Sequence, residues 1–188
     1  MQRTLCGAAI ATLWLATACD NQPTDGAMPG GAAPPVPPDA GETAIEAAPG
    51  QIAEASNAFG FALLKELSAS TNGNVLFSPL SVEMALSMVW NGASGETQSA
   101  IREVLGHDEA LSLARANASW KALRDSFAEL PPSVTLDIAN SAWHRTGFAI
   151  ERDFLKAVET AYDAEVRALD FASPEAVATI NDWVAGKT

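Results

Sequence analysis

Residues 74–97, NVLFSPLSVEMALSMVWNGASGET, decide the fold class of this chain. The aromatic and aliphatic run at 74–77 predicts a short strand, and the Ser-Pro dipeptide that follows predicts a turn into a helix. Ser81 is well placed to cap that helix. Apolar residues lie almost all round it: Val82, Met84, Ala85, Leu86, Met88 and Val89. A helix of this kind is typical of the middle of a domain, so the chain should contain a sizeable core.

The rest of residues 51–188 predicts more helices than strands. Helices are predicted over 53–67, 96–105, 151–162 and 174–185, with a further one from Asp108 to the prolines at 131 and 132; strands are predicted over 133–143 and 164–171. Pro174 suits the first position of the last helix. These elements indicate one partial α+β domain rather than two domains.

Residues 1–18 have the features of an export signal. Arg3 precedes an apolar run at 5–16 that is too short to span a bilayer, and Ala-Thr-Ala at 16–18 fits a signal-peptidase site. Because Cys19 comes next, the site also resembles a bacterial lipobox, in which that cysteine carries lipid. Leu15 lies one place further from Cys19 than is common, so plain secretion remains an alternative.

Residues 19–50 are predicted to form a disordered linker. Seven of the eleven prolines and five of the thirteen glycines lie in this segment. It has too little contiguous apolar sequence to offset the entropy of ordering. After a lipidated Cys19, such a linker would hold the folded domain away from a membrane surface.

Charge and cysteine content limit the possible partners. The net charge is −12, and removing residues 1–18 takes away one arginine and no acid, which leaves −13. This acidity argues against nucleic acid and against anionic lipid as partners, which leaves the anchor at Cys19 as the membrane contact. Cys6 lies in the signal and Cys19 is the lipid site, so no disulfide framework is expected.

The residues give no enzyme signature. The two histidines, His107 and His144, lie on either side of a long helix and a strand, and no HExxH, GxSxG, CxxC or phosphate-binding glycine loop occurs. Ser78 with His144 and an aspartate remains a formal triad, although each histidine is explained by its place at the end of an element. No cofactor and no metal is predicted. The residues alone therefore indicate an exported interaction domain.

Four segments in order resemble the serpins, a family of mostly serine-protease inhibitors. They are the opening stretch at 74–97, LDIANSAWH at 136–144, AEVRALDF at 164–171 and INDWVAGKT at 180–188. The resemblance implies an incomplete serpin fold, with the N-terminal helices and the first strands of the main sheet. It also implies a serine protease as partner, trapped when a cleaved bait loop inserts into that sheet. The loop would lie beyond Thr188, so the chain is expected to be a fragment that lacks it.

The resemblance also assigns structural residues. Ser78 and Ser81 match the serines at the head of the buried helix, beneath the opening sheet. Asn181 and Trp183 match the helix that lies across the sheet, with Trp183 as a packing anchor. The alternatives are a non-inhibitory binding or structural protein of the cell envelope and, more remotely, a secreted hydrolase.

Two surface features have simpler interpretations. Some serpins bind glycosaminoglycans through the helix that corresponds to the one after Asp108. Three bases lie there, Arg115, Lys121 and Arg124, but they are interleaved with acids and indicate a solvated helix face. The triplet at 117–119 fits the glycosylation motif, but its place in the middle of a helix indicates a chance match.

Overall fold

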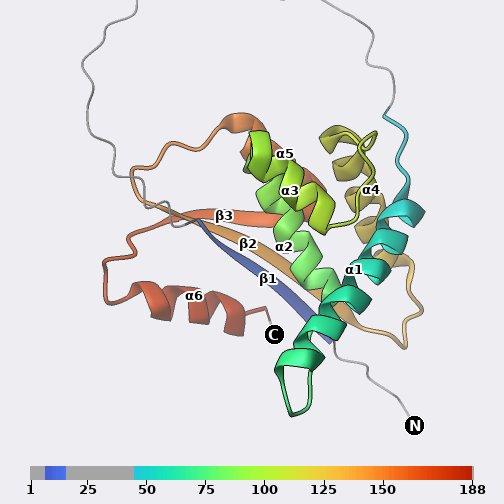
Figure 1. Cartoon of the computed structure of the whole chain (residues 1–188). Coiled ribbons are helices and arrows are strands. Elements are labelled where there is room, and N and C mark those ends of the chain that lie inside the picture. The colour runs from blue at the N-terminus through green and yellow to red at the C-terminus, as the bar shows by residue number, and fades with distance from the viewer. Residues whose placement is uncertain (1–6, 16–44, 188) are drawn as a thin grey trace, which may run out of the picture.

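The computed structural model describes residues 7–15 and 45–187 of the chain. Its elements in chain order are β1 (Gly7–Leu15), α1 (Pro49–Ser70), α2 (Pro79–Gly92), α3 (Gly95–Val104), α4 (Leu113–Ser126), a 3₁₀ turn (Phe127–Glu129), β2 (Leu136–Arg145), α5 (Arg152–Tyr162), β3 (Ala164–Leu169) and α6 (Ala176–Ala185). Helices α1 to α5 gather on one side of a small sheet, and α6 lies apart from them (Figure 1). The predicted α+β class is confirmed.

The sheet has the order β1-β2-β3, and all its strands are parallel. β2 and β3 pair from Asn140 opposite Ala164 to Arg145 opposite Leu169. Helix α5 connects these two strands, because parallel neighbours need a crossover rather than a tight turn. Asp163 ends α5 with a left-handed φ of 52° and lets the chain turn directly into β3.

The two faces of β2 and β3 pack against different helices. Ile138 and Val166 pack on the same core cluster as residues of α2 and α5, whereas Trp143 and Leu169 pack with α6. This division follows from the alternation of side chains along a strand. Helix α2 therefore lies under one face of the sheet, and α6 covers part of the other.

Helix α2 reaches the centre of the larger core. Met84 and Met88 are fully buried there with residues from α1, α4, α5 and β3: Ile52, Trp120, Val158, Ala161, Tyr162 and Ala164. The prediction that the helix after Ser81 is buried in the middle of the domain is confirmed, although the helix begins at Pro79.

Three local predictions were wrong. Asp108 does not cap α4; its carboxylate accepts a hydrogen bond from the Ala110 N–H in the preceding turn, and Ser112 caps the helix. Pro174 lies in a turn two residues before α6 rather than at the first position of that helix. No strand forms at 74–77, because no other strand among the described residues pairs with that segment.

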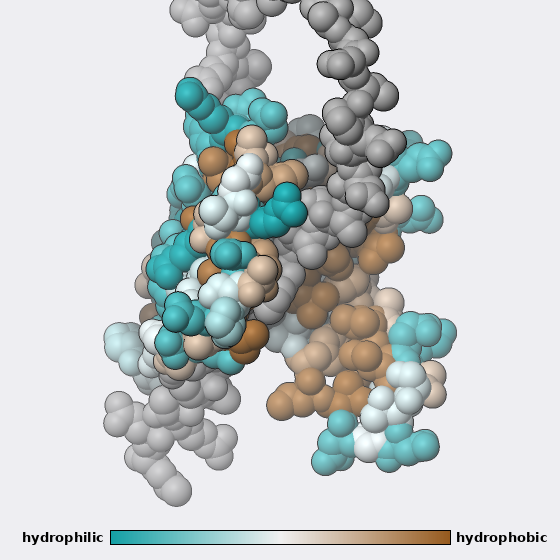
Figure 2. All heavy atoms as spheres, turned by 90° about the vertical axis from the view of Figure 1, so that its left-hand side faces the viewer, coloured by the Kyte–Doolittle hydropathy of each residue, from teal (hydrophilic) through white to brown (hydrophobic). Residues whose placement is uncertain are grey.

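The segment at 74–77 adjoins an apolar surface. Leu76 is 98% exposed and Phe61 of α1 is 74% exposed. A cleft of about 480 Å³ lies beside them, lined by Phe61, Phe77 and neighbouring side chains of α1 and α4. In Figure 2 the lower end of the molecule, formed by the C-terminal half of α1 and the segment after it, shows this hydrophobic surface above a hydrophilic tip.

The apolar run predicted to be an export signal is partly described. Its residues Gly7–Leu15 form β1, which pairs with β2 from Gly7 opposite Leu136 to Leu15 opposite His144. β1 lies within residues 1–18, so this pairing would be lost if they were removed. Their removal on export stays a prediction. Helix α1 begins at Pro49, two residues before the predicted start of the domain. No helix in the described ranges is long and apolar enough to cross a bilayer.

Candidate functional site: the head of α2 and the helix across the sheet

Ser78 and Ser81 form a hydroxyl pair at the start of α2. Ser78 has an extended backbone, and Pro79 follows it at the first helical position, where a missing N–H costs nothing. The Ser78 hydroxyl oxygen accepts from the Ser81 N–H at 3.3 Å and from the Ser81 hydroxyl at 2.9 Å. Ser78 is therefore the capping residue, and the prediction that Ser81 caps the helix was wrong. The Ser-Pro order could have shown this, because it places proline inside the first turn.

Helix α1 approaches the head of α2 closely. A Cβ atom added to Gly60 would lie 2.9 Å from both Cβ and Cγ of Pro79. Such a separation is shorter than two carbon atoms tolerate, so this crossing requires glycine on α1. The serine pair is thus fixed against α1 on one side and by the helix that it begins on the other.

Asn140 joins the sheet to the helices beneath it. Its amide nitrogen donates to the Tyr162 carbonyl at 2.7 Å and contacts the Met84 sulfur at 3.8 Å. Asn140 is 3% exposed, so this bond connects β2, the end of α5 and the middle of α2 in a dry environment. Sequence reasoning missed Asn140. The only available signal was an asparagine among apolar residues on the inward face of a predicted strand.

A second amide pair secures α2 to α4. Asn91 and Asn117 exchange side-chain hydrogen bonds at 3.0 and 2.7 Å, and the Tyr162 hydroxyl donates to the Asn117 oxygen at 3.0 Å. Burial raises the pKa of Tyr162 far above its usual range, so this hydroxyl stays a donor. The Asn117 side chain is therefore used in packing, which explains the motif at 117–119 without a sugar.

Trp183 fixes α6 to the sheet. Its ring meets Trp143 of β2 edge to face, with 6.3 Å between centroids and 84° between planes. Its indole N–H donates to the Glu165 carboxylate of β3, and this hydrogen bond lowers the pKa of Glu165. The Lys187 ammonium lies 5.6 Å from the same ring. Asn181, the other residue assigned to this helix, is exposed on α6.

The two histidines lie in different surroundings. His107 is buried against Trp90 with 5.4 Å between ring centroids, and burial lowers its pKa. The His144 ring contacts the Arg145 carbonyl, while the Ser78 hydroxyl is paired with Ser81 as described above.

On α4, Lys121 and Arg124 pair with Asp125 at 2.5 and 3.3 Å. Lys121 is exposed, whereas the Arg124 side chain is only 21% exposed, so the predicted solvated face holds for Lys121 alone of these two. Cys19, the predicted lipid site, lies outside the described residues.

Comparison with known proteins identifies the family. The family model described as serpin (serine protease inhibitor) matches residues 54–188. Iripin-2 of Ixodes ricinus is 33% identical over 141 residues, which cover 73% of this chain and 36% of that protein. A serpin-like protein of Thermococcus kodakarensis is 34% identical over 143 residues, covering 73% of this chain and 32% of the other. The chain thus spans about a third of the length of the relatives it matches.

Solved structures agree. Reactive-loop-cleaved human thyroxine-binding globulin matches with a TM-score of 0.68 and 27% identity, over 74% of this chain and 42% of that one. Reaction-loop-cleaved lamprey angiotensinogen matches with a TM-score of 0.61 and 26% identity, over 74% and 40%. The matched region contains the head of α2, the strands β2 and β3 and the helix α6, in the order that the sequence predicted. The chain belongs to the serpin family.

Proposed function

We propose that this chain is the N-terminal part of a serine-type endopeptidase inhibitor that traps its protease by loop insertion. Its relatives support a serpin-type protease inhibitor at the level of the family. The observation that carries the proposal is the layered arrangement of α2, the strands β2 and β3, and α6 within the matched residues. An inhibitor of this kind needs a sheet that can accept a further strand while a buried helix and a covering helix adjust.

In this proposal the residues described above would be structural parts of that machinery. Asn140 joins the sheet to the end of α5 and to α2, and the Ser78–Ser81 pair closes the head of α2; these hydrogen bonds would have to be remade if the sheet moved. Trp183 holds α6 on the opposite face. The bait loop, and with it the choice of protease, would be encoded after Thr188. The native inhibitor would then be kinetically trapped, and the inserted strand would release the stored energy.

We further propose export and anchoring. Residues 1–18 would direct export, Cys19 would receive a diacylglyceryl group, and residues 19–50 would space the domain from the membrane. The protein would then act on proteases in the cell envelope or outside the cell. Simple secretion after cleavage remains the alternative location.

The test of inhibition uses the gene with the sequence that follows Thr188. The full-length protein is incubated with a panel of serine proteases of trypsin-like, chymotrypsin-like and elastase-like specificity, and the mixtures are separated on a denaturing gel. Inhibition predicts a covalent complex whose mass is the sum of the protease and most of the inhibitor. If every protease only cleaves the protein, without a stable complex, the inhibitor proposal is wrong.

A second candidate is a non-inhibitory binding protein. Thyroxine-binding globulin in complex with its ligand is among the similar structures, with a TM-score of 0.67 and 28% identity. A serpin domain can therefore serve as a carrier. Cleavage without complex formation in the same experiment would favour this candidate.

A further inference from the structure

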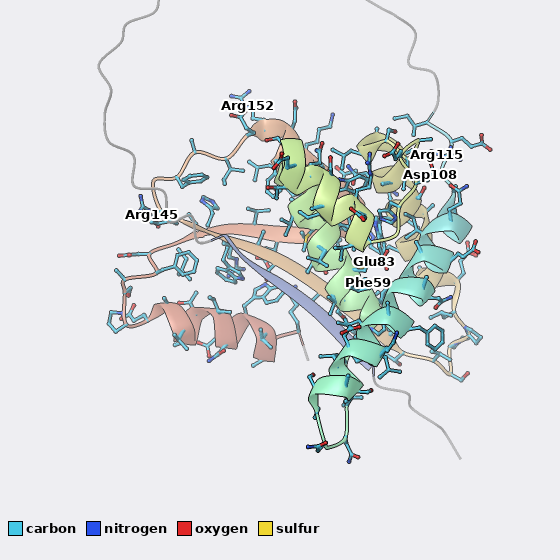
Figure 3. The ribbon with its side chains drawn as sticks, in the orientation of Figure 1. Phe59, Glu83, Asp108, Arg115, Arg145 and Arg152 are labelled. Carbon is cyan, nitrogen blue, oxygen red and sulfur yellow. The ribbon has the colours of Figure 1, made fainter. Side chains whose placement is uncertain are left out.

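Glu83 is a carboxylic acid buried in the protein interior. It lies in the middle of α2, on the side where α1 passes (Figure 3), and its side chain is 0% exposed. Neither carboxyl oxygen has a hydrogen bond of normal geometry to another described residue. Ionising a carboxyl group in such a place is costly unless a cation or several donors compensate. The structure must therefore keep this group neutral or tolerate strain when it ionises.

The surroundings of Glu83 form a polar cluster inside the larger apolar core. Ser87 follows it by one helical turn and is fully buried; its hydroxyl acts on Tyr162 but makes no hydrogen bond of normal geometry to a described residue. Ser56 of α1 is the hydroxyl that acts on the carboxyl group from the neighbouring helix. Tyr162 of α5 is close enough for the charge of Glu83 to raise its pKa. The cluster thus spans α1, α2 and α5.

No cation among the described side chains offsets a charge on Glu83. Among the described side chains, the groups that interact with Glu83 are Ser56 of α1 and Tyr162 of α5, of which only Tyr162 titrates. No lysine, arginine or histidine of the described ranges contributes to the pKa shift of Glu83. Among the described residues, a negative charge on Glu83 would therefore have no opposite charge to offset it.

We propose that Glu83 is a proton-operated switch that sets how tightly α1 and α5 pack on α2. The neutral carboxyl group can donate its proton to a hydroxyl oxygen and fits the closed core. The carboxylate cannot donate, and it draws water into the interface and loosens it. Ser56 also lines the cleft between α1 and the head of α2, which gives protons a route from solvent. This inference concerns the fold and does not depend on the proposed inhibition.

The direction of the effect follows from linkage. Burial raises the pKa of Glu83 from 4.5 to about 7, although Ser56 opposes part of the shift. The folded state therefore holds this proton to a higher pH than the unfolded state does. The stabilisation is complete below pH 4.5 and is lost as pH rises through about 7. A shift from 4.5 to about 7 corresponds to an increase of about 300-fold in the unfolding constant, and partial water entry would reduce it.

The experiment measures urea unfolding of the whole chain at pH 5, 6, 7 and 8, for the wild type, Glu83→Gln and Glu66→Gln. Glu66 is an exposed acid of α1 and serves as the matched control. The wild type and Glu66→Gln should lose stability between pH 5 and 8, with a rise of about 100-fold in the unfolding constant. Glu83→Gln should lose most of this dependence. An unchanged pH dependence in Glu83→Gln would overturn the proposal.

A second measurement does not require the variant to fold. The carboxyl carbon of Glu83 is followed by NMR in the labelled wild-type protein from pH 4 to 9. Titration near pH 7, together with faster amide exchange in α1 after ionisation, would support the switch. Titration below pH 5 would show that Glu83 reaches solvent or a partner in its ionised form, and the proposal would be wrong.

Discussion

Replacing Trp183 by alanine should detach α6 from the sheet while leaving the rest of the molecule folded. Helix α6 is held by a small cluster in which Ile180 and Trp183 pack on Trp143. It has only ten residues and no side-chain cap at its N-terminus. Because isolated helices shorter than about 12–15 residues are marginal in water, α6 depends on this contact to stay folded.

The size of the effect follows from the contacts that are lost. Truncating a buried tryptophan to alanine costs about 3–5 kcal/mol. The edge-to-face pair with Trp143 contributes about 0.5–1.5 kcal/mol of this total beyond its buried area. The hydrogen bond to Glu165 contributes about 1 kcal/mol, because the acceptor side chain is 37% exposed and water competes for it. A loss of at least about 3 kcal/mol of packing free energy is more than the intrinsic stability of a ten-residue helix can offset, so α6 should unfold locally.

Hydrogen exchange read by mass spectrometry measures this directly. In Trp183→Ala, the protection of amides at 176–185 should fall by about 100-fold or more, and that of α4 should be unchanged. In Trp183→Phe the protection of these amides should be intermediate, because an aromatic ring is kept and the indole N–H is lost. Val177→Ala is the matched control, because Val177 lies on the same helix and is 61% exposed. Equal loss of protection in α4 and α6 would refute the view that α6 is a separately held element.

Three further outcomes are expected. Gly60→Ala should destabilise the chain by about 1–3 kcal/mol in urea unfolding, because the added Cβ meets Pro79. Gly50→Ala is the control, because its added Cβ has no neighbour within 4 Å and should have no such effect. Equal effects of the two substitutions would contradict the tight crossing of α1 and α2. Ser78→Ala should cost about 1 kcal/mol through loss of the cap, and an unchanged urea midpoint would show that the hydroxyl is dispensable. In the exporting cell, mass spectrometry should find a diacylglyceryl group on Cys19, and Cys19→Ser should release the domain from membranes; an unmodified Cys19 at the mature N-terminus would exclude the anchor.

The pattern of apolar residues along the sequence predicted most of the helices and strands. The apolar residues almost all round the helix after Ser81 placed it correctly in the core, because a helix with so little polar surface is typical of a domain interior. The alternation along β2 was also readable, although the strand begins at Leu136 rather than 133. Both signals depend on local sequence and on burial, which are available before any contact is known.

Other features depend on partners far away in the sequence. The run at 74–77 has strand-like residues but no neighbouring strand among the described residues, so local propensity alone gave the wrong answer. The bond from Asn140 to the Tyr162 carbonyl joins two elements through a contact that no spacing rule predicts. Glu83 was hidden for a similar reason, since a glutamate in a helix usually marks the solvent side.

The polar groups of α2 argue for a helix that is not built for maximum stability. An entirely apolar α2 would pack against the same core, and replacing buried ionisable groups by apolar ones is often stabilising. Instead the helix buries Glu83, Ser81 and Ser87. Of these three groups, only the Ser81 hydroxyl makes a hydrogen bond of normal geometry to another described side chain, at the head of the helix. Buried groups without partners raise the free energy of the packed state, so α2 should be easier to displace than its apolar residues suggest. A sheet that must admit another strand, as proposed for the whole protein, requires such a helix beneath it.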